Sequence, residues 1–576
     1  MIMKKINKYL TPVIVSFVLV FWSCETTNLD MTNNPNSLTP DQASIDFFIN
    51  SIQEDFVRQI EGDADYDVND NWQSGGSTNG DGLSLFGSQL TRLMALTSSK
   101  KYNTNFLPSD SDDEWINAYT GIMQDIRTMV PAAEEAGLTR HVGVAQFIEA
   151  YVMTAMVDFY GDIPYSEAFE GEANLNPKLD SGASIYDAAL VLLDKAIANF
   201  QNTATANLAN DAFYNNDYTK WVKAANTLKM RLYNQRRLVD PTALSSIQAI
   251  LNSGNYISST ADDFEYRWPG TNASQPDTRH PRYGLNYTPT GAGDYMSNWL
   301  MHYMDTHNDP RIRYYFYRQT DCTPGASCNP AGNEETLQCS VQSAPPHYVS
   351  GGFTFCYLDN GYWGRDHQDN DGVPPDGFLR TTYGVYPAGG EFDDDRFSGI
   401  VPGTGGGGGA GITPILTAAW VDFMQAEIAM VNNDPGTAKT FLSSGLTKHI
   451  AKVQTFGSLD TSADLSYEPT ASDVSDFISS VETDFDNAAS MSDKWDILAE
   501  EYFVTVFGNG IESYNFYRRT GYPTTLQPSQ DPSPGVFARS MFYPSNAVNT
   551  NSNITQKPGV TEPVFWDNNP SAPIAN

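Results

Sequence analysis

The chain has 576 residues, of which 40% are hydrophobic and 12% aromatic, so it can bury a sizeable core and is not a disordered chain. Its 69 acidic residues outnumber its 34 basic residues, which gives a formal net charge of −35 at pH 7. This charge opposes the approach of polyanions and disfavours nucleic acid and heavily sulfated or uronate-rich polysaccharide as ligands, although it also fits a general solubility or high-salt adaptation.

The amino terminus has the pattern of a secretion signal. Three lysines precede a short apolar run that ends at Trp22, and this run is well below the ~20 residues that a membrane span needs. We expect a lipoprotein signal peptide over residues 1–23, a lipid-modified Cys24 as the first mature residue, and a lipidated tether over 24–39. Bulky residues before Cys24 depart from the usual small ones, so the alternative is an ordinary signal peptide in which Cys24 is incidental.

Three amphipathic helices are predicted between residues 145 and 231, because apolar residues recur there at helical spacing. Each helix must bury its apolar stripe on a neighbour, so we expect paired helices joined by short turns, the unit of an α-solenoid, although the pattern is too degenerate for a strict ~34-residue repeat. The stripes are Phe147, Ile148, Tyr151, Val152, Ala155, Met156 and Phe159, then Tyr186, Ala189, Leu190, Leu193, Ile197 and Phe200, then Trp221, Ala224, Ala225, Leu228 and Leu232.

The middle of the chain has a different composition. Residues from about 255 to 412 are dense in Gly, Pro, Asn and aromatic residues, and the glycine-rich run 403–409 is expected to be a mobile segment. Helices are expected to resume at Thr413, which can cap a first turn that contains Pro414. The chain ends in an irregular tail that is rich in Pro and Asn.

Several phrases in order along the chain resemble the SusD/RagB family of Bacteroidetes surface lipoproteins, specifically its SusD-like branch. They are LDMTNNPN, FYGDIPYSEAF, KWVKAANTLKMR, HNDPRIRYYFY and EYFVTVFGNGIESYNFYRRTGYP. The resemblance implies an all-α fold in which a scaffold of tetratricopeptide-like helical pairs carries a large irregular, loop-rich half. The expected organisation is one domain over 40–567, with the scaffold at about 40–250 and 413–525, a ligand-binding insert at about 255–412, and a tail over 568–576.

The same resemblance implies a function. A SusD-like protein would be a non-enzymatic lipoprotein of the outer membrane, lipid-anchored and facing the cell exterior, which captures oligo- or polysaccharide and delivers it to a SusC-like TonB-dependent transporter. The RagB side of the family implies an alternative with the same architecture, in which the cargo is peptide. A secreted glycoside hydrolase is a third possibility, which the helical pattern and the lack of an assignable catalytic pair disfavour.

The four cysteines after Cys24 lie close together in the insert. In an oxidising exported setting they predict two disulfides with three possible connectivities, of which Cys322–Cys328 plus Cys339–Cys356 is the simplest. Zinc is a less favoured alternative, because the spacing contains no CxxC pair.

Motifs for catalysis or cofactors are missing, and no catalytic residue is assigned. Two acidic stretches could bind calcium. The first contains Asp63, Asp65, Asp67 and Asn69, and the second offers Asp369 and Asp371 as weak candidate ligands. Neither stretch is an EF-hand, and solvated acidic loops are the favoured interpretation.

Binding would then depend on aromatic side chains in polar loops. Trp72, Trp268 and Trp363 lie in stretches too polar and too rich in Gly for a core helix, so they are candidates for exposed anchors, although each could instead pin its own loop. Planar polar groups nearby suit sugar hydroxyls. The candidate ligand-binding residues are Trp72, Trp268, Arg279, Tyr283, Trp363, Arg365 and Asp366.

Overall fold

The computed structural model describes residues 44–62, 82–271, 277–322, 337–372 and 375–569. The signal peptide, Cys24, the tether, Trp72, Cys328 and the acidic stretch from Asp63 to Asn69 lie outside these residues. The elements below belong to one unit, Ile45–Asn576.

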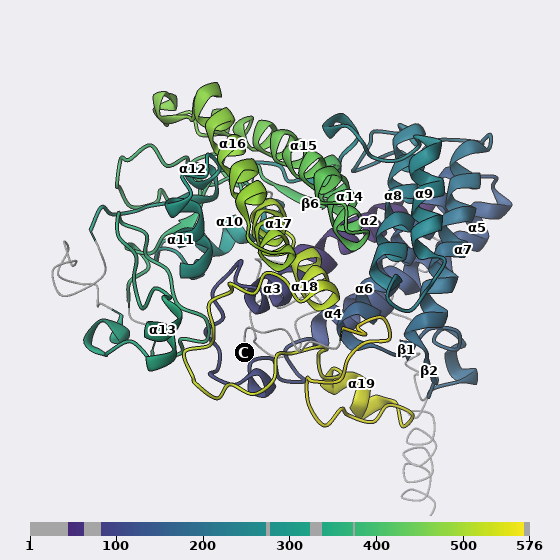
Figure 1. The fold of residues 1–576 in the computed structure, drawn as a ribbon. Helices are drawn as coiled ribbons and strands as arrows, with labels where there is room; N and C mark the ends of the chain where they lie inside the picture. The colour runs from purple at the N-terminus through teal and green to yellow at the C-terminus, as the bar shows by residue number, and fades with distance from the viewer. Residues whose placement is uncertain (1–43, 63–81, 272–276, 323–336, 373–374, 570–576) are drawn as a thin grey trace, which may run out of the picture. The chain divides into compact units, whose positions relative to one another are not determined.

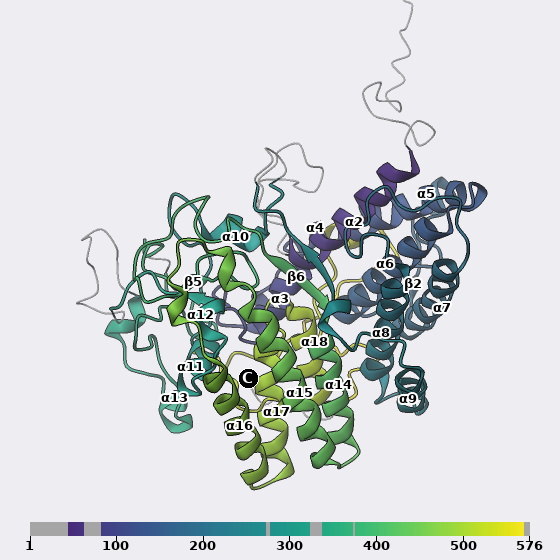
Figure 2. The same ribbon diagram turned by 90° about the horizontal axis from the view of Figure 1, so that it is seen from above.

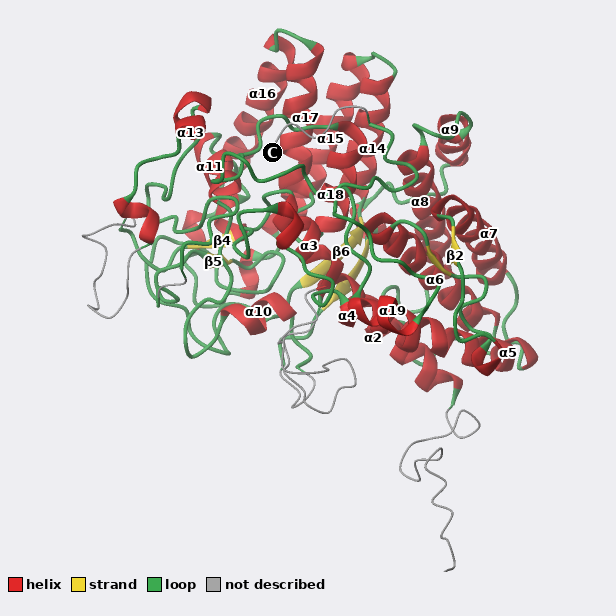
Figure 3. Cartoon of the chain, turned by 90° about the horizontal axis from the view of Figure 1, so that it is seen from below, coloured by secondary structure: helices red, strands yellow, loops and turns green. Residues whose placement is uncertain are grey.

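The prediction of an all-α scaffold is confirmed, and helices dominate the fold (Figure 3). In the first helical group α6 packs on α7, α7 on α8 and α8 on α9, as expected of paired helices (Figure 1). The group comprises α2 (Ile45–Glu61), α3 (Gly82–Leu90), α4 (Asp112–Ile116), the π-helix η2 (Asn117–Met123), α5 (Gln124–Glu135), α6 (Thr139–Tyr160), α7 (Gly182–Gln201), α8 (Tyr218–Arg236) and α9 (Ala243–Ser253).

Helix α6 is the centre of this group. Among the described residues it is the one helix long and apolar enough to cross a membrane, yet its apolar window is 100% buried within the protein. It is therefore a core helix, and its stripe residues from Phe147 to Phe159 are all buried as predicted.

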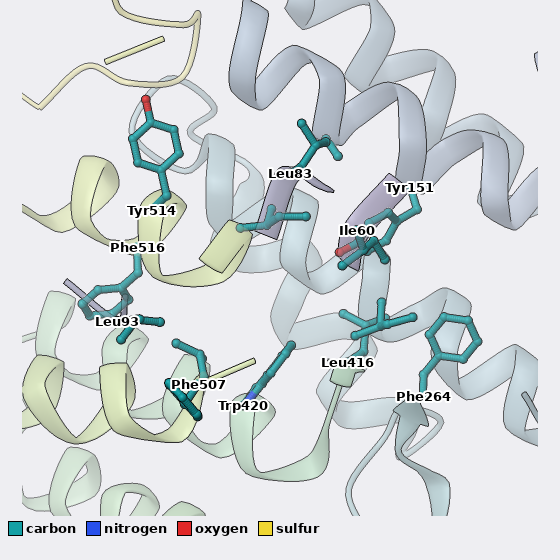
Figure 4. Packing of buried hydrophobic residues seen from close by; sticks show 14 of the residues in the cluster. Ile60, Leu83, Leu93, Tyr151, Phe264, Leu416, Trp420, Phe507, Tyr514 and Phe516 are labelled. Atoms are coloured by element: carbon teal, nitrogen blue, oxygen red, sulfur yellow. The ribbon is translucent and has the colours of Figure 1, made fainter. Parts of the chain in front are cut away.

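A second helical group follows the irregular part, and α14 packs on α15 and α17 (Figure 2). Apolar side chains from both groups meet in one core, where Tyr151 of α6, Leu416 of β6 and Trp420 of α14 lie close together (Figure 4). The group comprises α14 (Ala418–Val431), α15 (Pro435–Gln454), α16 (Ala471–Asn487), α17 (Met491–Thr505), α18 (Gly510–Thr520) and the short α19 (Ser545–Thr550).

The irregular half consists mainly of loops with short elements (Figure 3). In the described part of the chain, β1 pairs with β2, β3 with β6 and β4 with β5, all antiparallel. The helices of this half are α10 (Pro281–Asn286), α11 (Asn298–Thr306), α12 (Ile312–Tyr315) and α13 (Pro346–Gly351). The strands of the described chain are β1 (Ile163–Pro164), β2 (Leu179–Asp180), β3 (Phe264–Arg267), β4 (Phe316–Tyr317), β5 (Thr382–Tyr383) and β6 (Ile412–Leu416).

The predicted helix start at Thr413 is wrong. Thr413 and Pro414 lie in β6, which pairs with β3, and the helix begins at Ala418 after a cap in which the Thr417 side chain accepts the backbone N–H of Trp420. Proline is tolerated because β6 pairs with only one neighbouring strand. A threonine does cap this helix as predicted, but it is Thr417 and not Thr413.

The glycine-rich run 403–409 is also different from the expected mobile segment. The backbone N–H groups of Gly407 and Gly409 donate to the carbonyls of Gly390 and Gly389 at 3.1 and 3.0 Å. A Cβ on Gly406 would lie 1.8 Å from the carbonyl oxygen of Gly390. The glycines therefore permit close backbone packing rather than freedom of movement.

One of the two predicted disulfides is confirmed. Cys339 and Cys356 are bonded, and their buried sulfurs pack beside Trp363. Cys322 is also disulfide-bonded, but its predicted partner Cys328 lies outside the described residues.

Two of the sequence phrases that carry the family resemblance, KWVKAANTLKMR and EYFVTVFGNGIESYNFYRRTGYP, meet at Asp158, at the end of α6, through Arg231 and Asn515. This fully buried carboxylate accepts hydrogen bonds from Asn515 Nδ2 at 2.7 Å, Trp566 Nε1 at 2.9 Å and the Tyr186 hydroxyl. Because an unpaired buried carboxylate is costly, this node fixes the first helical group to α18 and to the end of the chain. These phrases are thus structural and do not form a ligand site.

Candidate ligand-binding cleft

A cleft of about 780 Å³ lies between α11 and α12 on one side and the segment before α16 on the other. Figures 1 and 2 show α16 of the second helical group next to α11 and α12 of the irregular half. The side chains around the cleft include Asp305, Asn308, Asp309, Arg313, Arg318, Asp321, Asn360, Tyr362, Asp395, Phe397, Tyr467, Glu468 and Asp473.

A buried ion cluster underlies the floor of the cleft and reaches its lining only through Asp309. Arg311 Nε donates to Asp309 Oδ1 at 2.8 Å, and Arg311 Nη2 donates to Glu501 Oε2 at 2.7 Å, with all three side chains fully buried. Burial opposes the charge of the guanidinium, but Asp309 and Glu501 raise the pKa of Arg311 above its usual value. The cluster ties the turn after α11 to α17 and holds the floor rigid.

Arg318 lies in the wall between two aromatic rings. Its guanidinium carbon is 4.9 Å from the ring centroid of Tyr362 and 4.9 Å from that of Phe397. It also forms a bidentate pair with Asp393, with Nε–Oδ2 and Nη2–Oδ1 distances of 2.6 and 3.0 Å. Such planar pairing and stacking immobilises the side chain.

Arg313 is held in a similar way, by the carboxylate of Asp395. Its two terminal nitrogens lie 2.9 and 3.1 Å from the carboxylate oxygens of Asp395. Its guanidinium carbon lies 5.3 Å from the ring centroid of Tyr467. Tyr467 remains 42% exposed, whereas Tyr362 is only 4% exposed, so Tyr467 is the ring that presents a face to solvent.

The loops around the cleft carry unusual backbone conformations. Of the ten non-glycine residues with positive φ in the described chain, four line this cleft: Asn308 (53°), Asn360 (63°), Asp395 (60°) and Phe397 (44°). Asparagine and aspartate tolerate this region, but for a bulky residue such as Phe397 it is an outlier. Local strain of this kind concentrates at functional sites, where surrounding contacts hold it in place.

The tryptophans predicted as exposed anchors do not line this cleft. Trp268 is 5% and Trp363 0% exposed, so the expected exposure is wrong for both. Trp268 Nε1 donates to Thr413 Oγ1 at 2.9 Å, while Trp363 packs beside the Cys339–Cys356 disulfide. Polar, glycine-rich loops can enclose a large ring because their own backbone groups are hydrogen-bonded inside the fold.

The predicted polar partners are also engaged internally. Arg365 lies buried over the ring of Tyr295, and its Nη2 donates to the Gly372 carbonyl at 2.5 Å. Asp366 accepts from Asn298, Gln527 and the backbone of Cys356, and burial raises its pKa to about 6. Both residues stabilise the insert and are closed to a ligand in this structure.

Arg279 and Tyr283 form a separate cluster beneath the glycine-rich run. Arg279 Nη1 donates to the Gly403 carbonyl at 2.8 Å, and the ring of Tyr283 stacks on that of Tyr287 with centroids 4.4 Å apart. Tyr283 is fully buried. The prediction placed Arg279 and Tyr283 in one site with Trp363, Arg365 and Asp366, but the structure does not bring the two sets together.

The weak calcium candidates face basic side chains. Asp371 Oδ1 lies 2.6 Å from Lys100 Nζ, and Asp369 Oδ2 lies 3.9 Å from Arg365 Nη1. Within the described ranges, no group of three or more His, Cys, Asp or Glu side chains is placed to hold a metal ion. The acidic stretch is therefore used for internal ion pairing at these two positions.

The side chains that line the cleft carry no signal of a binding site in the sequence. Arg313 lies in the phrase HNDPRIRYYFY, which indicates only a family resemblance. Tyr467 lies about 150 residues further on, in a polar stretch that resembles an ordinary loop. Only the fold places the two side by side.

Comparisons with known proteins agree with one another. Residues 63–344 match a family model described as "Starch-binding associating with outer membrane", and residues 412–560 match one described as "Susd and RagB outer membrane lipoprotein". A search of curated proteins found no match.

Solved structures share the fold. A SusD homologue from Bacteroides fragilis superposes with a TM-score of 0.62 at 16% identity, covering 91% of this chain and 100% of that one. A SusD/RagB family protein from Bacteroides thetaiotaomicron gives 0.62 at 15% identity, covering 91% and 99%. A chitin-binding SusD homologue from Flavobacterium johnsoniae gives 0.59 at 17% identity, covering 90% and 99%.

Proposed function

Because the chain belongs to the SusD/RagB family of outer membrane lipoproteins, we propose that it is a non-catalytic surface protein that captures oligo- or polysaccharide and delivers it to a SusC-like TonB-dependent transporter. Cys24 would carry the lipid anchor, with the protein facing the cell exterior. The chitin-binding homologue from Flavobacterium johnsoniae supports a glycan as cargo.

The observation that carries this proposal is the exposed ring of Tyr467 at the wall of a rigid polar cleft. The C–H face of a sugar ring is apolar and slightly positive, so it packs on the negative face of an aromatic ring. Asp305, Asn308 and Asn360 line the same cleft and offer oxygens and amide groups to hydroxyls. Glycan binding requires this combination of a flat apolar face and polar groups around it.

The cleft is built for binding without large rearrangement. The Arg318 side chain is held by contacts with two rings, and the Arg311 side chain is held by a buried ion pair below the cleft. These side chains therefore lose little conformational freedom when a ligand binds. A preorganised site loses less conformational entropy on binding and so retains more of its contact energy. Trp72 remains a predicted contributor and lies outside the described residues.

Native affinity electrophoresis of the purified protein against a panel of neutral and acidic polysaccharides tests the proposal. We expect retardation by at least one polysaccharide and its loss in Tyr467→Ala. The matched control is Tyr357→Ala, because Tyr357 is 41% exposed but lies outside the cleft. Retardation that survives in Tyr467→Ala would contradict the assignment of the cleft, and retardation by no polysaccharide would contradict glycan capture.

A further inference from the structure

The charges around the cleft are not balanced, and this bears on which glycan it accepts. Both arginines in the walls are already engaged. Arg318 is paired with Asp393, and Arg313 with Asp395. Because each guanidinium already donates its paired N–H groups to a protein carboxylate, neither arginine is available to form the same bidentate pair with a carboxylate or sulfate on a ligand.

Four carboxylates in the cleft form no ion pair with a lysine or arginine among the described residues: Asp305, Asp321, Glu468 and Asp473. Asp305 does interact electrostatically with the exposed His302. Three of the four carboxylates accept hydrogen bonds from neutral groups. Asp305 accepts from the Asn360 amide at 3.4 Å, Glu468 from the Tyr314 hydroxyl at 3.2 Å, and Asp473 from the backbone N–H of Thr470 at 2.7 Å.

Apart from Lys4, Lys5 and Lys8 at the amino terminus, the residues outside the described ranges include no lysine or arginine. The stretches 63–81, 272–276, 323–336, 373–374 and 570–576 contain no lysine or arginine in the sequence. Asp305 comes from α11, Asp321 from the loop after β4, Glu468 from the segment before α16 and Asp473 from the first turn of α16, so the four carboxylates do not form one run along the chain.

We infer that the cleft selects oligosaccharides that carry free amino groups, such as glucosamine oligomers, over their N-acetylated and uronate counterparts. This inference rests on the proposed glycan capture at the same site. A sugar ring stacked on Tyr467 brings its substituents toward the polar walls, and an ammonium there gains attraction from several carboxylates that no protein cation offsets. A uronate would meet the same carboxylates with repulsion.

Calorimetric titration of the full-length protein with matched tetramers tests this inference. The tetramers are β-1,4-linked glucosamine, its N-acetylated form, cellotetraose and tetragalacturonate, at about pH 6, where free amines on a sugar are largely protonated and uronates are not. We expect glucosamine tetramer to bind at least about tenfold more tightly than cellotetraose at low salt, and that advantage to shrink at high salt. Equal binding of the two, or preferred binding of tetragalacturonate, would overturn the inference.

Two double variants separate local charge from net charge. Asp305→Asn with Glu468→Gln keeps the side-chain shape but removes two cleft charges, and it should abolish the ratio by which glucosamine tetramer binds more tightly than cellotetraose, whatever the change in cellotetraose affinity itself. Glu134→Gln with Glu135→Gln makes the same change in net charge on the exposed end of α5 and should preserve the advantage. An advantage that survives in the first variant would overturn the inference.

The proposed function fails by a different result. If no tetramer binds, or if Tyr467→Ala leaves the binding of all tetramers unchanged, glycan capture at this cleft is wrong whatever the charge preference. A tetralysine peptide that binds while all four saccharides fail would transfer the cationic preference to peptide cargo and overturn the inference for sugars.

Discussion

The guanidinium of Arg313 covers one face of the Tyr467 ring, with 5.3 Å between its central carbon and the ring centroid, and leaves the ring 42% exposed. Asp395 fixes the guanidinium through two contacts of 2.9 and 3.1 Å. The ring is therefore held in place by an ion-paired guanidinium and keeps solvent-exposed surface at the cleft that both residues line.

Tyr467→Phe should retain ligand affinity within about twofold, since it keeps the ring and its contact with Arg313, whereas Tyr467→Ala should weaken binding by about tenfold or ~1.4 kcal/mol. Titration of both variants with the best-bound saccharide measures the difference. A loss in Tyr467→Phe as large as that in Tyr467→Ala would mean that the hydroxyl, and not the ring face, carries the contact.

Arg311→Met should lower the free energy of unfolding by about 3–5 kcal/mol, because it leaves Asp309 and Glu501 buried without their shared cation. Urea unfolding followed by tryptophan fluorescence measures it. Arg267→Met is the control, since Arg267 pairs with Glu265 but its side chain is 74% exposed, and it should change stability by less than ~1 kcal/mol. Similar values for the two variants would rule out a special role for the floor cluster.

Replacing Cys339 and Cys356 together by alanine should cost about 3 kcal/mol, because the bond closes a loop with a sequence separation of 17 and its sulfurs are buried with Trp363. The comparison is denaturant unfolding of the wild type, with and without reductant, beside the double variant. If the unfolding midpoints coincide in all three samples, the insert is stable without this covalent link.

Gly406→Ala and Gly403→Ala should differ in their effect on stability although both glycines have positive φ, 62° and 72°. The left-handed backbone alone costs alanine about 1–2 kcal/mol, which is all that Gly403→Ala should lose because nothing lies within 4 Å of its added Cβ. Gly406→Ala should lose about 1–3 kcal/mol more through its clash with Gly390. Thermal unfolding of the pair measures the gap, and equal melting temperatures would contradict close packing of this run.

The stability of the wild type relative to His280→Asn should fall as the pH falls below about 6.5. Burial, and then the nearby charge of Arg282, lowers the pKa of His280 to about 3. Between the usual pKa of histidine, about 6.5, and this value, the unfolded chain binds a proton that the folded protein does not. The stability that neutral His280 contributes is therefore complete above pH ~6.5. Below that pH the free energy of unfolding falls by about 1.4 kcal/mol per pH unit.

Asparagine at position 280 keeps an oxygen that can accept the backbone N–H of Arg282, the contact that the His280 ring now makes at 3.1 Å. Denaturant unfolding of both proteins between about pH 7.5 and 4.5 gives the difference. Parallel stability curves over that range would show that His280 becomes protonated within the folded protein.

Helices with a clear apolar stripe could be predicted from the sequence, because burial on one neighbour imposes a regular spacing. The stripes of α6, α7 and α8 are of this kind. Spacing does not show that a short strand precedes a helix, and for this reason the sequence predicts a helix start at Thr413, which lies in β6, and not at the actual cap Thr417.

The irregular half could not be predicted in the same way. Trp363 and Arg365 lie in a polar stretch, yet both are buried, because loops far apart in the sequence close over them. The cleft itself joins Arg313 to Tyr467 across about 150 residues, and no local pattern records such a contact. The sequence alone could predict the scaffold and the covalent link Cys339–Cys356 but not the walls of the cleft.

The residues below the cleft are buried, whereas those on one of its walls lie at the surface, and this difference affects how ligand specificity can change by mutation. Arg311 and its two carboxylates are sealed in the interior, whereas Tyr467 and Glu468 stand on a surface turn before α16. Exchanges on that turn alter what the cleft holds at little expense to folding, because exposed loop positions contribute little to stability. Random libraries restricted to the turn should thus yield many folded proteins with new ligands, which makes this scaffold a practical starting point for engineered glycan receptors.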